Sequence, residues 1–451
     1  MATHLDDTPV HLRGNGRPVS EEQTLTDLKV TGTIPPELDG RYIRTGTNPF
    51  SGYSAHPFMG DGMVHGVRLR GGKADWYRNR YVQTPFITNP DIDSNDPSIM
   101  MDMKASRANT HVVGHAGKIY VLEEAHFPYL IDGNLDTLGP TDFNGVLKSS
   151  FTAHPKICPE TGEMLAFGVN PMPPYLRYHR VSPEGDLIQV EDITIGGPVM
   201  MHDFNITRNY VIFMDLPAVL SLEMAMSGET MPIRWDDNYP SRFGVMPRDG
   251  NDAQVKWFDL NPCFVFHPMN AFESGDKVIL DVLRYPYVWR DSALDMPPAV
   301  LWRYTLDMTT GKVHEEQLDD VATEFPRVAD SVVGLDYRFG YAMRLDDRDD
   351  IGDSISSRGG VRKYDMQTGA TTDLDYGPGR VGGEPVFVPR EGSQAEDDGY
   401  LMTFVYDAGK DASELVITDA ATMDADPIAA IDLPRVPSGF HGSWIPSSIA
   451  G

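Results

Sequence analysis

The chain has 451 residues, which is enough for two or three ordinary domains or for one large all-β unit. Its 38 basic and 66 acidic residues give a formal net charge of −28, which argues against nucleic-acid binding and against charge-driven docking on an anionic membrane. Two cysteines, Cys158 and Cys263, are too few for a disulfide-stabilised scaffold.

Residues 1–7 contain neither the basic region nor the apolar region of a signal peptide. No run of about 18 apolar residues occurs, so no membrane-spanning helix is expected. No low-complexity linker divides the chain. These observations predict a cytoplasmic protein in which residues 1–451 form a single domain.

Short strands separated by turns follow one another from the N-terminus onward. Residues 63–70 and 74–81 alternate with the period of two that is typical of strands, and similar short segments occur at residues 118–122, 210–214 and 278–282. Residues 85–106 are rich in Pro, Asn, Asp and Ser and are predicted to form a loop.

A turn pattern of the form Asp-x-x-Thr-Gly recurs between strands. It ends at Gly311 and again at Gly369, 58 residues later, and related turns end at Gly162 and Gly185. A strand–turn–strand unit repeated at such spacing favours the blades of an all-β propeller, although β-sandwiches carry similar turns.

Residues 216–235 are the one long candidate for a helix. The segment is apolar and rich in methionine, with a partly helical pattern. It is interpreted as a core or lid helix, or alternatively as an adaptable wall of an apolar tunnel whose mouth faces a membrane surface.

Four of the thirteen histidines have unusual neighbours in the sequence. His154 and His267 each precede a proline, and His202 lies between Met and Asp. His441 lies between two nearby glycines, Gly439 and Gly442. The four histidines are 48, 65 and 174 residues apart. A lone histidine is usually a surface or hydrogen-bonded residue, and the other nine are interpreted in that way. In a propeller, however, the inner strands of all blades face one axis, so these four would converge.

Imidazole ligands suit Fe, Cu, Zn and Ni alike, so residue type alone does not select the metal. Histidines bound to a metal usually donate their second N–H to a carboxylate or carbonyl group. Glu124, Glu324 and Glu384 lie in apolar segments, where an unpaired carboxylate would be costly. Each is therefore expected to have a partner, either a histidine of this kind or an ordinary arginine or backbone amide.

Taken in order, these segments resemble the carotenoid cleavage oxygenase family over nearly the whole chain. The resemblance rests on the blocks at residues 44–49, 60–63, 109–113, 152–156, 201–203, 267–273, 324–327, 384–389 and 439–444. It implies a seven-bladed β-propeller, with loops and short helices forming a cap over a metal site on its axis.

The resemblance also implies a function. Fe(II) would be bound by His154, His202, His267 and His441, and Glu124, Glu324 and Glu384 would orient three of these histidines, leaving the first one without such a partner. Thr110 matches a threonine whose methyl group crowds an open iron position. The implied reaction is the insertion of both atoms of O2 across a carbon–carbon double bond of a hydrophobic alkene, giving two carbonyl products.

The substrate is less defined, because the family spans carotenoids, apocarotenoids, stilbenes and phenylpropenoids. Stilbene-cleaving members carry lysine just before the first of the three glutamates, where this chain has Glu123. The chain is also short between Gln83 and Ala108, where those members place another phenol-contacting residue. Both departures favour a carotenoid or apocarotenoid, with stilbenoids or phenylpropenoids as the alternative.

Two other classes of function are considered. A propeller that binds a hydrophobic ligand without catalysis would not need all four histidines and all three glutamates. A zinc hydrolase would need a carboxylate placed as general base, as in His-Glu-x-x-His, and this motif does not occur here. Oligomeric state and membrane contact are left open by the sequence.

Overall fold

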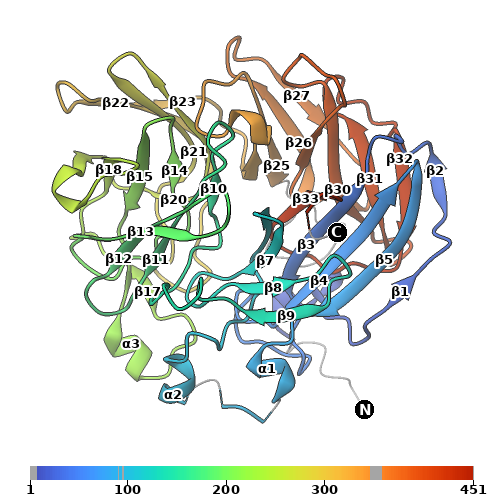
Figure 1. Cartoon of the computed structure of the whole chain (residues 1–451), viewed down its shortest axis with the longest axis horizontal. Helices are drawn as coiled ribbons and strands as arrows, with labels where there is room; N and C mark the ends of the chain where they lie inside the picture. Colours follow the sequence, from blue (N-terminus) through green and yellow to red (C-terminus); the bar gives the residue numbers. More distant parts are fainter. Residues whose placement is uncertain (1–7, 90, 94–95, 346–357, 450–451) are drawn as a thin grey trace.

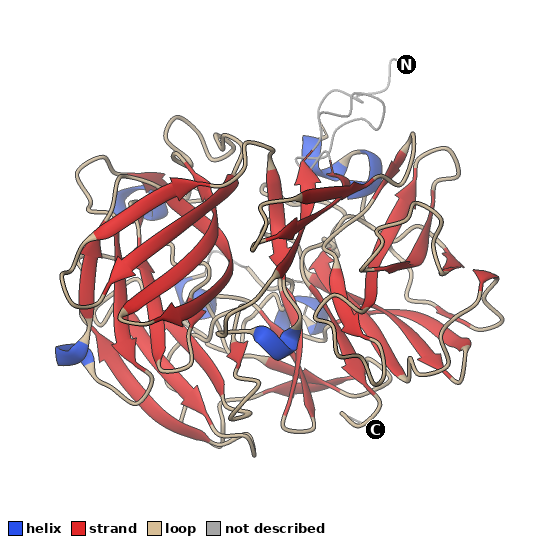
Figure 2. Ribbon diagram, turned by 90° about the horizontal axis from the view of Figure 1, so that it is seen from above, coloured by secondary structure: helices blue, strands red, loops and turns tan. Residues whose placement is uncertain are grey.

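The computed structural model of the chain describes residues 8–449 with the exception of 90, 94–95 and 346–357. Seven antiparallel sheets are arranged in a ring around one axis, so the fold is the expected seven-bladed, almost all-β propeller (Figures 1 and 2). A small ribbon of two strands, β16 (Ala218–Leu220) and β17 (Ile233–Trp235), is an excursion from the fourth sheet.

We number the blades from the N-terminus and list their strands in hydrogen-bonded order. Blade 1 contains β1 (Thr24–Leu25), β5 (Lys73–Tyr81), β4 (Gly62–Arg70), β3 (Gly40–Thr47) and β33 (Gly442–Pro446). Blade 2 contains β6 (His111–His115), β7 (Lys118–Leu122), β8 (Tyr129–Ile131) and β9 (Thr137–Pro140). Blade 3 contains β10 (Lys156–Ile157), β11 (Met164–Val169), β12 (Leu176–Val181) and β13 (Leu187–Ile193). Blade 4 contains β14 (Asn205–Ile206), β15 (Tyr210–Asp215), β18 (Arg242–Pro247) and β19 (Lys256–Asp259).

The remaining three blades complete the ring. Blade 5 contains β20 (Phe264–Ser274), β21 (Lys277–Tyr285), β22 (Val300–Asp307) and β23 (Val313–Gln317). Blade 6 contains β24 (Thr323–Arg327), β25 (Phe339–Leu345), β26 (Arg358–Asp365) and β27 (Thr371–Leu374). Blade 7 contains β2 (Val30–Gly32), β32 (Ala429–Leu433), β31 (Ala412–Asp419), β30 (Gly399–Asp407) and β28 (Arg380–Val381), and β29 (Val386–Pro389) also pairs with β30.

The repeated turn confirms the sequence interpretation and has a clear physical cause. In the turn between β22 and β23, the Asp307 carboxylate accepts hydrogen bonds from the backbone N–H groups of Thr309 and Thr310, at 3.0 and 2.7 Å. Gly311 then takes φ +75°, a region that favours glycine. The turn between β26 and β27 is built in the same way by Asp365.

The inner strands of neighbouring blades contact one another around the axis: β33 contacts β6 and β29, and β20 contacts β14 and β24. The ring is closed by pairing of the C-terminal strand β33 with β3 from the N-terminal region. This close approach requires glycine, because a Cβ added to Gly46 would lie 2.6 Å from the Cα of Gly439. Ring closure therefore draws the C-terminal segment onto the axis.

Two predicted elements differ from the structure. Residues 216–235 form β16, the short helix α3 (Leu222–Met226) and β17, instead of one long helix, because Pro217, Gly228 and Pro232 interrupt any helix and the flanks pair as strands. In α3, the Met226 side chain is 89% exposed, so this part is no core helix. Residues 85–106 contain two one-turn helices, α1 (Pro85–Thr88) and α2 (Pro97–Met100), each starting at proline.

The three short helices lie near one another at the bottom of the view in Figure 1. Single turns of 3-10 helix occur at Val10–Leu12, Gly14–Gly16, Asp252–Gln254 and Asp330–Val332. Among the described residues, no helix is both long and apolar enough to cross a bilayer. Contact of residues 216–235 with a membrane surface, a single domain over residues 1–451 and a cytoplasmic location remain predictions.

Candidate metal centre

The four histidines predicted to converge come from the inner strands of four different blades. His154 and His202 lie just before β10 and β14, His267 lies within β20, and His441 immediately precedes β33. All four are buried. The structure therefore brings together the set that the sequence predicted, and each member is positioned by its own blade.

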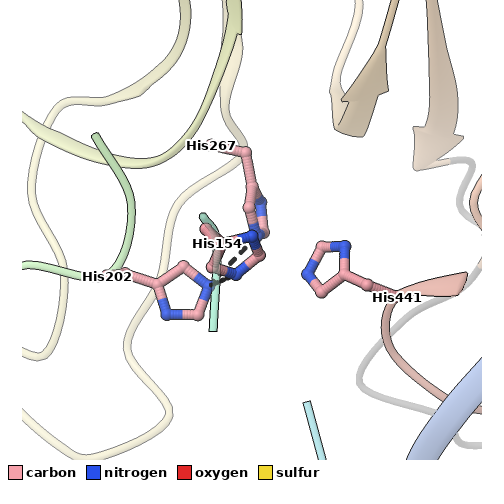
Figure 3. A group of neighbouring side chains, drawn as sticks. All are labelled: His154, His202, His267 and His441. Carbon is pink, nitrogen blue, oxygen red and sulfur yellow. Dashed lines mark hydrogen bonds between the residues drawn. The ribbon is translucent and has the colours of Figure 1, made fainter. Parts of the chain in front are cut away.

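One ring nitrogen of each histidine lies within 4.8 Å of one ring nitrogen of each of the others, and Figure 3 shows His441 facing the other three rings. The Nε2 atom of His202 is 3.0 Å from that of His154 and 3.1 Å from that of His267. Two nitrogens that bind one metal at about 2.1 Å are about 3.0 Å apart at a right angle and about 3.4 Å apart at a tetrahedral angle. Both separations are compatible with two nitrogens that share one metal ion.

Three of the histidines have a carboxylate at their other ring nitrogen. The Nδ1 atom of His202 contacts Glu124, that of His267 lies 2.5 Å from Glu324, and that of His441 lies 2.8 Å from Glu384. A carboxylate at Nδ1 holds the proton there and leaves the Nε2 lone pair free for a metal. These are the three pairings that the family resemblance implied.

Two of these carboxylates are themselves held by further donors. Glu324 accepts hydrogen bonds from the Tyr285 hydroxyl and from the backbone N–H of Phe325, both at 2.8 Å. Glu384 accepts one from the backbone N–H of Gly442 at 2.9 Å. The imidazole rings are therefore oriented by groups that have little freedom to move.

The titration behaviour of the histidines fits metal binding. Burial and the neighbouring imidazoles lower the pKa of His154 and of His441 well below the usual value, so both rings are neutral. Burial also opposes protonation of His202, but contact with Glu124 outweighs it and raises the pKa of His202. His154 and His441 are therefore in the neutral form that binds a metal ion, and metal binding at His202 would displace the second proton of its ring.

The charges around the cluster also fit a divalent cation. Among the described residues, four carboxylates lie within 4 Å of a cluster histidine: Glu124, Glu324, Glu384 and Asp203. Two cations, Lys156 and Arg327, lie within the same distance of these carboxylates. Two negative charges remain, which a divalent metal ion would balance in this buried setting.

The cluster has two different surroundings. Phe266 packs edge-on against His202 at 5.2 Å between ring centroids, and Phe325 lies 5.3 Å from His267 and 4.7 Å from His441. A cavity of about 370 Å³, lined by polar and charged side chains as well as apolar ones, also reaches His154, His267 and His441, and neither phenylalanine lines it. A partly polar cavity therefore reaches the cluster, and the rings of Phe266 and Phe325 pack against its histidines outside that cavity.

Thr110 lies next to His441 in the structure, and Glu123 lies in the segment that also carries Glu124. Thr110 is buried, its carbonyl accepts a hydrogen bond from the His441 N–H at 3.0 Å, and its hydroxyl donates to Asn109 at 2.9 Å. The Glu123 carboxylate contacts His126 at 2.7 Å and accepts hydrogen bonds from Ser106 and from the backbone of Ala125. Glu123 is thus already engaged with three donors of its own surroundings.

Two residues near the cluster were not singled out from the sequence. His111 is buried, lines the cavity, and donates from Nδ1 to the carbonyl of Ala153 at 2.9 Å, which holds the peptide before His154. Phe325 has φ +52°, an uncommon conformation for a bulky residue. The only signal for His111 was its place beside Thr110, and nothing in the sequence indicated the backbone of Phe325.

Comparison with known proteins identifies the family. A family model described as retinal pigment epithelial membrane protein matches residues 16–446. A carotenoid cleavage oxygenase of Mycobacterium tuberculosis is 38% identical over 97% of this chain and 98% of its own length. The chain belongs to the carotenoid cleavage oxygenase family. Another member, the carotenoid 9,10(9',10')-cleavage dioxygenase 1 of Arabidopsis thaliana, is 37% identical over 98% of this chain and 91% of its own length.

Solved structures agree with this membership. The lignostilbene dioxygenase of Pseudomonas brassicacearum has a TM-score of 0.89 and 29% identity, covering 98% of this chain and 99% of its own. A cobalt-substituted apocarotenoid oxygenase of Synechocystis has a TM-score of 0.83 and 26% identity, covering 97% and 98%. Membership in this carotenoid cleavage oxygenase family supports an oxidoreductase of the dioxygenase type.

Proposed function

We propose that this carotenoid cleavage oxygenase binds Fe(II) through His154, His202, His267 and His441. The observation that carries the proposal is the set of four converging histidines, three of them backed by a carboxylate at the second ring nitrogen. A cobalt-substituted form of a structural neighbour shows that a divalent transition metal is accepted in a protein of this fold. Iron is the metal whose chemistry with O2 fits the family name.

The proposed reaction inserts the two atoms of O2 across one carbon–carbon double bond. The bond between the two alkene carbons breaks, each carbon gains one oxygen atom, and two carbonyl products form without any further reductant. Bound Fe(II) would supply the activation of O2. The protein would supply four neutral ligands, three of them held at their second nitrogen by a carboxylate, so that they bind without shuttling protons.

We place the apolar alkene beside the aromatic rings that pack against the cluster. Phe266 and Phe325 contact its histidines, and Phe58 packs edge-on against Phe266 and Phe440 at 6.5 and 5.9 Å. Aromatic rings around the alkene would exclude water, which protects a reactive intermediate from side reactions. Thr110, next to the same centre, is proposed to restrict one open ligand position with its methyl group.

We propose an apocarotenoid or carotenoid as the substrate. The relatives at 36–38% identity are named for carotenoid cleavage, whereas the lignostilbene dioxygenase is 29% identical. At the position of the lysine in stilbene-cleaving members, this chain has the carboxylate of Glu123, which already contacts three donors and, unlike a lysine, would oppose formation of a phenolate. A stilbenoid or phenylpropenoid is the second candidate, favoured by the higher TM-score of the lignostilbene dioxygenase.

The test combines metal analysis with oxygen uptake. Protein reconstituted anaerobically with Fe(II) should contain about one iron per chain and should consume O2 when an apocarotenal is added, releasing two carbonyl products. Uptake with a hydroxystilbene alone would overturn the carotenoid assignment and leave the reaction type standing. Absence of iron, or binding of zinc alone, would overturn the metal centre itself.

A further inference from the structure

His154 differs from the other three histidines of the cluster in what its Nδ1 atom meets. Among the described residues, the nearest carboxylate oxygen is Oδ2 of Asp203, at 3.8 Å, which is too far for a direct hydrogen bond. A histidine that binds a metal through Nε2 carries its proton on Nδ1, and a buried N–H group without an acceptor is costly. His154 therefore needs an acceptor that no direct contact supplies.

Asp203 lies where it can supply this acceptor through a water molecule. His154, Lys156 and Asp203 all line the cavity of about 370 Å³, which is polar here and wide enough for ordered water. A separation of 3.8 Å between a donor and an acceptor beside such a cavity is a place where one water molecule can bridge the two. The Asp203 carboxylate is oriented in part by the backbone N–H of Phe204, from which it accepts a hydrogen bond at 2.7 Å.

Asp203 is also paired with a cation, unlike Glu124 and Glu324. The Nζ atom of Lys156 lies 2.8 and 3.0 Å from its two carboxylate oxygens. Three carboxylates already contact the cluster, so a fourth one without a cation would add negative charge that a divalent metal could not balance. The lysine lets Asp203 act as an acceptor for His154 without changing the net charge of the centre.

We infer that Asp203 is a positioning residue for the metal centre: it orients His154 through one bridging water and is kept electrically neutral by Lys156. The inference rests on the proposed metal centre, and it assigns a role to the acid after His202 and to the lysine that follows His154 by two positions. The alternative is a purely structural role, in which the ion pair only ties β10 to the segment before β14. The two roles make different predictions for the two partners.

Cobalt(II) is a suitable probe, because a structural neighbour has been obtained with cobalt in place of its own metal. In the Co(II) protein, the N–H protons of ligating histidines give strongly shifted NMR signals that disappear in D2O when they exchange. Four such signals are expected from the wild-type protein. Co(II) affinity by titration and the melting temperature of the metal-free protein complete the measurements.

Asp203→Asn removes the charged acceptor but retains a side chain of the same shape. We expect the fourth N–H signal to be lost or to exchange at least tenfold faster, and Co(II) affinity to fall by about tenfold, the lower end for partners of metal ligands. Lys156→Gln retains a donor for Asp203 and removes only the cation. This variant should keep the fourth signal and bind Co(II) at least as tightly as the wild-type protein.

Asp215→Asn is the matched control, because Asp215 is fully buried and accepts hydrogen bonds from Tyr239 and Arg242, both at 2.8 Å, away from the cavity. It should change neither the signals nor the affinity. Equal losses in Asp203→Asn and Lys156→Gln would show a structural tie and overturn the inference, as would four unchanged signals in Asp203→Asn. A wild-type protein that binds no Co(II) would refute the metal centre as well, whereas Co(II) binding without oxygenase activity of the iron form would refute the proposed function alone.

Discussion

Replacing either of two buried glutamates by glutamine should weaken metal binding to very different extents. Glu324 and Glu384 each hold the Nδ1–H of one histidine, at 2.5 and 2.8 Å. Their remaining partners differ in kind. Glu324 faces the Tyr285 hydroxyl, which can turn and accept a hydrogen bond, whereas Glu384 faces the backbone N–H of Gly442, which can only donate.

In Glu324→Gln, the amide oxygen can keep His267 and the N–H of Phe325, while the amide NH2 group donates to Tyr285. The loss is the difference between a charge-assisted and a neutral hydrogen bond, about 1–1.5 kcal/mol, which corresponds to roughly tenfold in Kd.

In Glu384→Gln, the amide NH2 group must face either Gly442 N–H or His441 Nδ1–H, so one buried donor loses its acceptor. This adds roughly 1–3 kcal/mol, for a total of about 3 kcal/mol and a loss of more than 100-fold. His441 could relieve the conflict by moving its proton to Nε2, but it would then present no lone pair to the metal. Either outcome removes this ligand from the centre.

The assay is a Kd for Fe(II) under anaerobic conditions, or for Co(II), measured by competition with a chromophoric chelator for wild type and both variants. Melting temperatures of the metal-free proteins control for general destabilisation. Equal losses in the two variants, or a weaker Kd for Glu324→Gln than for Glu384→Gln, would refute the reasoning from donor and acceptor identity.

Three further predictions concern the centre and its neighbourhood. His202→Ala should abolish iron binding and oxygenase activity together, as metal analysis and oxygen uptake would show; turnover by an iron-free variant would contradict the metal centre. Metal at about 100 times its Kd should stabilise the fold by about 2.7 kcal/mol, or roughly 3 °C in melting temperature, reversed by a chelator. Contact with Glu123 outweighs burial and raises the pKa of His126, and contact with His126 lowers that of Glu123 despite burial. The advantage of wild type over His126→Gln in urea unfolding should therefore be full at pH 5–6.5 and be lost as the pH rises through the raised pKa of His126; an advantage that grows with pH would contradict this pairing.

The blade turns and the ligand histidines could be predicted because each is recognisable from a short segment of the sequence. An aspartate that accepts two backbone N–H groups before a left-handed glycine needs only five residues, and such turns mark the blade repeat at Gly311 and Gly369. His441 is recognisable for a similar reason, since Gly439 allows close approach of Arg44 and the ring closure that follows.

The remaining features depend on distances between blades, which no short segment contains. The 3.8 Å gap between His154 and Asp203, for example, is set by how the segments before β10 and before β14 are placed relative to each other. The interpretation of residues 216–235 as one long helix was wrong. A methionine-rich composition suits a helix, whereas the pairing of β16 with β17 depends on contacts between residues that are distant in the sequence.

The distribution of groups over the ring explains why this fold can hold such a centre. His267 lies within the inner strand of blade 5, and the other three histidines lie just before the inner strands of blades 3, 4 and 1. Glu324 lies within the inner strand of blade 6, and Glu384 lies just before β29 of blade 7. No loop carries two ligands, so the spacing of the nitrogens is fixed by the packing of whole blades and by closure of β33 onto β3. Rigid elements position such sites more accurately than loops do. The close approach of Gly46 to Gly439 is therefore as important to the metal centre as His441 itself, because it fixes the position of the backbone that carries this ligand.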